Sequence, residues 1–192
     1  MYRSQAEHSA DCERYPFEAI PRRVFLDTNV INLMVKYGDQ IFEQAPLPEE
    51  PDCTRAHDVE ALMHVCHLGG RAPWQIVAAA KTLDEIDGTQ DRSVRKNLMD
   101  YAVEIVSRDS DDIDYAISLG RRMIDAPSTA VLPDASDREI IGNAIGLGCD
   151  FFCTCDRRTI VSKRDRLRHL PIRIATPAEW WSNVKPWAAL WH

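Results

Sequence analysis

The sequence predicts an α/β fold, a three-layer sandwich around a central, mostly parallel sheet. Short apolar runs suited to buried strands alternate along the chain with amphipathic stretches suited to helices. Acidic residues stand at or just past the ends of two of these runs, and ligands of open α/β sheets bind just outside the carboxyl ends of the strands. A chain of 192 residues is long enough for one domain with a substantial core. We expect a loosely held extension over residues 1–21 and a single domain over residues 22–192.

The composition favours a cytoplasmic protein. A hydrophobic fraction of 45% and a charged fraction of 28% are ordinary for a globular domain. Residues 1–15 lack the apolar centre of a secretory signal, and no apolar run approaches the ~20 residues that cross a membrane. The net charge of −7 argues against a surface that coats nucleic acid broadly. It leaves room for a nuclease, because metal-binding carboxylates are themselves acidic.

The first expected strand covers residues 22–26 and leads directly into Asp27. A helix over about 29–37 follows, with Gly38 as its stop signal. The position of Asp27 suits a metal ligand at a strand end. The competing interpretation is that Asp27 or a neighbour merely caps the helix, since short polar side chains satisfy its first N–H groups. Residues 44–54 contain three prolines and predict a loop or lid-like insertion.

The next expected helix, residues 55–68, carries apolar residues at helical spacing. Several histidines and cysteines lie on it or just before it: Cys53, His57, His64, Cys66 and His67. Their spacing fits none of the usual zinc patterns, so we do not expect a metal site here.

The second expected strand covers residues 73–80 and is followed by a short helix with Glu85 about one turn into it. Two amphipathic helices over 91–106 and 109–123 should cover the sheet.

An acidic helix start comes next. Ser136 and Glu139 form the S-x-x-E pattern of a capping box, so we expect Ser136 as the N-cap and Asp137 as the first helical residue. An acid there is also favoured simply by the helix dipole. The helix should end at Gly148, and a buried strand over residues 151–154 should lead to Asp156.

The last part of the chain is basic and then aromatic. Residues 157–169 contain six arginines and lysines, which could contact RNA phosphates through Arg164 and Arg166 or form an ordinary solvated surface. A final strand over residues 172–174 precedes a helix opened by Thr176 and Pro177. We expect the tail to pack over the core or at a subunit contact; its tryptophans are Trp180, Trp181, Trp187 and Trp191.

In a parallel sheet, strand ends and helix starts meet at one edge, which would bring four carboxylates together. They belong to Asp27, Glu85, Asp137 and Asp156. Such a group is repulsive unless a cation lies among the carboxylates. Oxygen ligands of this kind suit Mg²⁺ or Mn²⁺, and the chemistry they permit is phosphodiester hydrolysis.

Four segments resemble, in order and spacing, the pattern of PIN-domain ribonucleases, which include VapC-type toxins. The segments are VFLDTNV, TLDE, SDREIIGNAIGLGCDFFCTCD and PIRIATPAEW. The resemblance implies a PIN-like fold and Mg²⁺- or Mn²⁺-dependent cleavage of RNA. It also implies RNA as substrate, an antitoxin protein as a possible partner, and a homodimer.

By this resemblance, the four carboxylates match the acidic metal-binding and catalytic positions of the family. Asn29 and Thr154 match the polar residues that position them. Asp84 is a rival for the role of Glu85, and Asp134 is either a supplementary ligand or a helix cap.

Two other functions compete with the nuclease. A phosphatase with an aspartyl nucleophile would need a second aspartate two residues after Asp27, where Asn29 stands. The other alternative is a catalytically silent PIN-like module that binds RNA or a protein partner.

Overall fold

A computed structural model describes residues 2–47, 52–69, 71–78 and 110–191 of the chain. Its centre is a parallel sheet of four strands in the order β2-β1-β3-β4. The strands are β1 (Arg23–Leu26), β2 (Gln75–Val77), β3 (Phe151–Cys153) and β4 (Arg173–Ala175). The predicted α/β class with a parallel sheet is confirmed for these strands.

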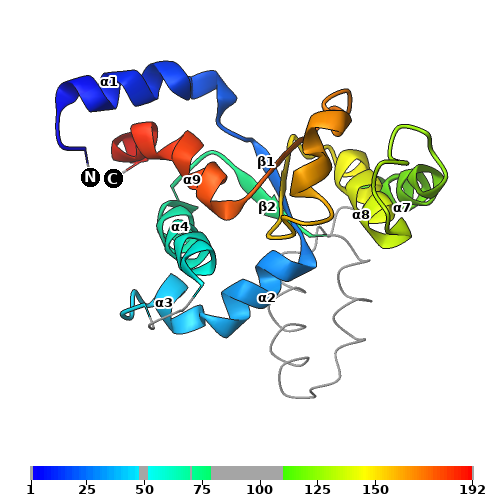
Figure 1. Ribbon diagram of the computed structural model, residues 1–192, viewed down its shortest axis with the longest axis horizontal. Coiled ribbons are helices and arrows are strands. Elements are labelled where there is room, and N and C mark those ends of the chain that lie inside the picture. Colours follow the sequence, from blue (N-terminus) through cyan, green and yellow to red (C-terminus); the bar gives the residue numbers. More distant parts are fainter. Residues whose placement is uncertain (1, 48–51, 70, 79–109, 192) are drawn as a thin grey trace.

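Helices cover both faces of this sheet (Figure 1). Side chains alternate between the faces, so Val24 and Leu26 join one buried cluster while Phe25 joins the other. On the first face lie α2 (Thr28–Lys36), α3 (Gly38–Phe42), α4 (Cys53–Gly69) and α9 (Pro177–Val184). On the second lie α8 (Ala135–Gly146), the 3₁₀ helix η2 (Val161–Leu167) and, packed on α8, α7 (Ser110–Ile124). This arrangement agrees with three layers.

Glycines allow α7 and α8 to pack closely. A Cβ atom added to Gly142 would lie 2.7 Å from the Cα of Gly120, and one added to Gly146 would lie 2.5 Å from the Cα of Ala116. Real Cβ atoms do not approach so closely, so a larger residue would force the helices apart. The contact holds α8, and with it Asp137, in a defined position over the sheet.

The N-terminal segment corrects an expectation. The sequence predicts a loosely held segment over residues 1–21, but these residues include α1 (Gln5–Arg14) and a 3₁₀ helix η1 (Phe17–Ala19). The His8 ring lies 2.8 Å from the carbonyl oxygen of Pro186, and the Trp187 indole N–H donates to the Tyr15 carbonyl at 2.8 Å. Pro186 and Trp187 both belong to η3 (Lys185–Trp191), which lies beside α1 in Figure 1.

The tryptophan-rich tail packs on the core, the first of the two placements considered for it. Trp180 is 1% exposed, and Trp181 and Trp187 pack against the same cluster. The Trp191 side chain lies outside the described residues.

Several helix boundaries differ from the predicted ones. Gly38 begins α3 instead of ending α2. Helix α8 ends at Gly146, and Gly148 turns the chain toward β3 with a φ of 69°.

Ser136 is not the N-cap of α8: Asp134 is, and its carboxylate accepts a hydrogen bond of 2.8 Å from the Ser136 N–H. Aspartate is as good a cap as serine, and its position two residues earlier lets the helix start at Ala135.

Some predictions fall on parts of the chain outside the described residues. These are the end of the second strand, the short helix with Asp84 and Glu85, the helix over 91–106, and the centre of the Pro-rich loop. No helix in the described ranges has the length and apolar character needed to cross a membrane.

Candidate active site at the carboxyl edge of the sheet

Asp27 follows β1 and is buried, with 6% of its surface exposed. Its Oδ1 atom accepts a hydrogen bond of 2.8 Å from the Thr28 N–H, so Asp27 does cap α2. Its Oδ2 atom accepts two further bonds, each of 2.6 Å, from the Asn29 amide and the Thr154 hydroxyl. Three donors on one buried carboxylate compensate for the water it loses on burial. A helix cap requires only the first of them.

Asn29 and Thr154 join the end of β1 to the end of β3. The Asn29 side chain accepts a bond of 2.7 Å from the Cys155 N–H, and its amide group donates to Thr154 Oγ1 at 3.2 Å. Thr154 Oγ1 also accepts from the Asp156 N–H at 3.0 Å. These side chains therefore fix the backbone after β3 relative to Asp27.

Asp156 lies in the loop that follows β3. Its Oδ1 atom accepts from the backbone N–H groups of Arg158 and Thr159 at 2.9 and 2.7 Å, and its Oδ2 atom accepts from the Thr159 hydroxyl. Burial by itself would raise the pKa of Asp156, but the hydrogen bonds from Thr159 and Arg158 outweigh it and lower that pKa. The carboxylate is therefore held in its charged form.

Thr159 brings a third carboxylate into the same group. Its hydroxyl oxygen, in contact with Asp156, also lies 3.3 Å from Oδ2 of Asp137 in the first turn of α8. One hydroxyl carries one hydrogen, so it donates to only one of the two carboxylates at a time. Sequence reasoning missed Thr159; the signal was a threonine three residues after an aspartate, a common local turn pattern.

The structure therefore brings three of the four predicted carboxylates to one edge of the sheet: those of Asp27, Asp137 and Asp156. Glu85 lies outside the described residues. Within the described ranges, no three His, Cys, Asp or Glu side chains lie close enough together to hold a metal ion. Asp134 acts as the cap of α8, one of the two roles considered for it.

The basic stretch after Asp156 is partly occupied by internal ion pairs. Arg164 lies 2.7 Å from Glu179, and Arg168 lies 2.9 Å from Asp165. The hydrogen bond to Glu179 raises the pKa of Arg164. Arg166 has no ion-pair partner in the part of the chain that the structure describes. Of the two residues expected to contact RNA, Arg166 is therefore the more available.

The histidines and cysteines of α4 have other surroundings. The His64 ring stacks on Trp181 with a centroid separation of 4.6 Å, and His67 lies 3.1 Å from the Gln44 amide. Burial raises the pKa of Cys66 to about 12, so its thiol stays protonated. These environments suit packing more than metal binding.

Comparisons of the chain with family models, curated proteins and solved structures returned no match. The PIN-domain resemblance therefore rests on the residue pattern alone.

Proposed function

We propose that this protein is a metal-dependent endoribonuclease that hydrolyses RNA phosphodiester bonds at the carboxyl edge of the sheet. The observation that carries the proposal is a set of contacts that links Asp27 through Thr154 to Asp156, and links Asp156 to Asp137 through the Thr159 hydroxyl, which donates to one of these two carboxylates at a time. It joins residues from three elements that are distant in sequence. A purely structural cap would need none of these long-range contacts.

The chemical type of these donors fits the proposed cofactor, although no three of the carboxylates in the described ranges lie close enough together to hold it. Every group in this set is an oxygen ligand of the hard type that Mg²⁺ and Mn²⁺ prefer. Asp27, Asp137 and Asp156, with Glu85, would hold the ion. When bound, it would supply charge stabilisation and a water of lowered pKa.

The residues of this chain would set the geometry. Asn29 and Thr154 hold the Asp27 carboxylate in one orientation, and the backbone N–H groups of Arg158 and Thr159 do the same for Asp156. Preorganised ligands of this kind need no rearrangement when substrate arrives.

The same proposal includes RNA as the substrate, a possible antitoxin protein as a partner, a homodimer and a cytoplasmic location. The alternative is a PIN-like module that binds RNA or a protein without cutting it.

The test measures hydrolysis of a mixed RNA substrate in Mn²⁺, in Mg²⁺ and in chelator, for the natural protein and for Asp27→Asn. Asp165→Asn is the matched control, because it makes the same chemical change at a carboxylate that is 74% exposed and pairs with Arg168. We expect metal-dependent cleavage that Asp27→Asn abolishes and Asp165→Asn retains. Cleavage that survives Asp27→Asn would contradict the assignment. Binding of RNA without cleavage in any condition would favour the silent module.

A further inference from the structure

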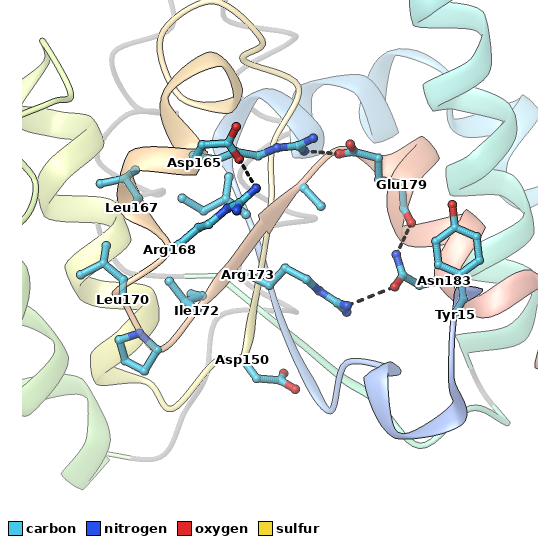
Figure 2. A pocket seen from close by; sticks show the side chains of 14 residues that line it. Tyr15, Asp150, Asp165, Leu167, Arg168, Leu170, Ile172, Arg173, Glu179 and Asn183 are labelled. Atoms are coloured by element: carbon cyan, nitrogen blue, oxygen red, sulfur yellow. Dashed lines mark hydrogen bonds and ion pairs between the residues drawn. The ribbon is translucent and has the colours of Figure 1, made fainter. Parts of the chain in front are cut away.

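The β4 edge of the sheet forms the floor of an open groove with a volume of about 610 Å³. This volume falls in the range of roughly 300–1,000 Å³ that is common for ligand sites. Figure 2 shows β4 running between two walls. One wall is η2 and the residues after it, including Leu167 and Leu170. The other is α9 with Asn183, together with Tyr15.

The strand on this floor has unpaired backbone groups. The Arg173 N–H donates to Asp150 and the Ala175 carbonyl accepts from Thr154, both at 3.0 Å. In a parallel pair, these bonds direct the backbone groups of Arg173 and Ala175 toward β3. The N–H and C=O of Ile174, between them, must then point away from β3. In the described ranges neither group has a hydrogen-bond partner.

The lining of the groove combines apolar and charged side chains, and its charges sum to zero. Its apolar members are Leu167, Leu170, Pro171, Ile172, Ile174 and Ala175. Its charged members are three arginines and three acids: Arg164, Arg168, Arg173, Asp150, Asp165 and Glu179. Two of the arginines are already held in ion pairs, with Glu179 and Asp165. A polyanion such as RNA would gain little here.

Arg173 is held in place by neutral groups. Its guanidinium donates to Asn183 at 3.1 Å and to the Ala19 carbonyl at 2.7 Å, and it lies over the Phe151 ring at 4.8 Å. The side chain is therefore fixed, and the groove keeps its shape without a ligand.

We propose that this groove docks an extended, uncharged, apolar peptide segment of a partner protein, which adds to β4 as one more strand. The alternating N–H and C=O groups of an extended peptide are the complement of the free Ile174 groups. A second copy of this chain fits less well, because its own β4 lies between the same two walls. Two recessed edges cannot approach to the spacing of about 4.8 Å that paired strands need. This proposal is independent of the nuclease.

The test starts from a phage-displayed library of random peptides of about seven residues, a usual strand length, selected against the full chain. We expect enrichment of uncharged peptides with apolar residues at every second position. The best peptide is then made in two forms, N-methylated at one or the other alternate set of amides. One form should bind like the parent, and the other, which lacks the hydrogens that face Ile174, should bind at least about tenfold more weakly.

Backbone amide exchange measured by NMR gives a second readout that needs no variant. In the free protein, the Ile174 N–H should exchange faster than those of Arg173 and Ala175, and the peptide should slow it. As a variant test, Ile174→Pro removes the outward N–H without touching the bonds to β3, and Ile174→Val keeps it. Binding should be lost only in the proline variant.

The proposal would be overturned by the absence of any enriched peptide, by equal binding of both methylated forms, or by a bound peptide that leaves the Ile174 amide unprotected. The proposal would also be overturned if the protein without peptide were a dimer whose Ile174 amide exchanges slowly, because β4 would then be a contact between copies.

Discussion

Arg157 and Asp58 form a two-point ion pair between the loop after β3 and helix α4. Arg157 Nη1 lies 2.7 Å from Asp58 Oδ2, and Nη2 lies 3.0 Å from Oδ1. The Asp58 side chain is 2% exposed and that of Arg157 is 38% exposed. The Ala178 N–H also approaches Asp58 Oδ1, at 3.4 Å. Because Arg157 directly follows Asp156, this pair fixes the loop that carries a proposed metal ligand.

The unequal burial of the pair predicts an unequal response to mutation. Arg157→Leu leaves the Asp58 carboxylate buried without a charge partner and should lower the free energy of unfolding by roughly 3 kcal/mol. Asp58→Asn leaves a half-exposed guanidinium that water can reach, so it should cost about 1–2 kcal/mol. Urea unfolding measures both values. Equal losses of unfolding free energy in the two variants would contradict the unequal burial. Asp165→Asn is the control, because Asp165 belongs to the exposed pair with Arg168, and it should change stability by less than about 1 kcal/mol.

The Thr159 hydroxyl should support metal binding, if the nuclease proposal holds. Thr159→Val removes the group that touches both Asp137 and Asp156 while keeping the shape of the side chain. We expect Mn²⁺ affinity, measured by calorimetry, to fall roughly 10–100-fold, the usual effect of losing a partner of a metal ligand.

Thr159→Ser is the matched control, because it keeps the hydroxyl and loses only a methyl group. It should bind Mn²⁺ nearly as the natural protein does. A serine variant as weak as the valine variant would show that packing, and not the hydroxyl, matters at this position.

Glu179 should contribute to the loss of stability in acid. Burial by itself would raise the pKa of Glu179, but hydrogen bonds from Arg164 and Thr176 outweigh it and lower that pKa. A carboxyl whose pKa is lower in the folded state stabilises the fold above its unfolded pKa, near 4.3, and that stabilisation disappears as the pH falls through the folded value.

Glu179→Gln should therefore be less stable than the natural protein at neutral pH, and the difference should shrink below about pH 4. Unfolding curves recorded from pH 7 to about pH 3 check this. A difference that stays constant over the whole range would show that Glu179 acts through packing rather than charge.

The close packing of α7 on α8 predicts different tolerance at two glycines. Gly142→Ala places a methyl group 2.7 Å from the Gly120 backbone and should cost roughly 1–3 kcal/mol of unfolding free energy. Gly38→Ala places the same methyl group where no atom lies within 4 Å, and it should be neutral or slightly stabilising. Thermal unfolding of the two variants gives the comparison. A neutral Gly142→Ala would mean that the helices are further apart than described.

The sequence by itself determined the α/β class, the four described strands to within a few residues, and the places of Asp27 and Asp156 just after two of them. These features follow from local patterns: the apolar run of a buried strand, and the polar residue that ends it. The start of α9 after Thr176, with Pro177 as its first residue, is local in the same way.

Only the tertiary structure decided which side chains meet. Thr159 contacts Asp137 across 22 residues of sequence, Asp58 pairs with Arg157 across 99, and His8 reaches Pro186 across 178. No local pattern encodes such contacts, because they depend on how the layers pack. The same reason explains the docked N-terminal helix and the groove along β4: both exist only once distant parts of the chain lie side by side.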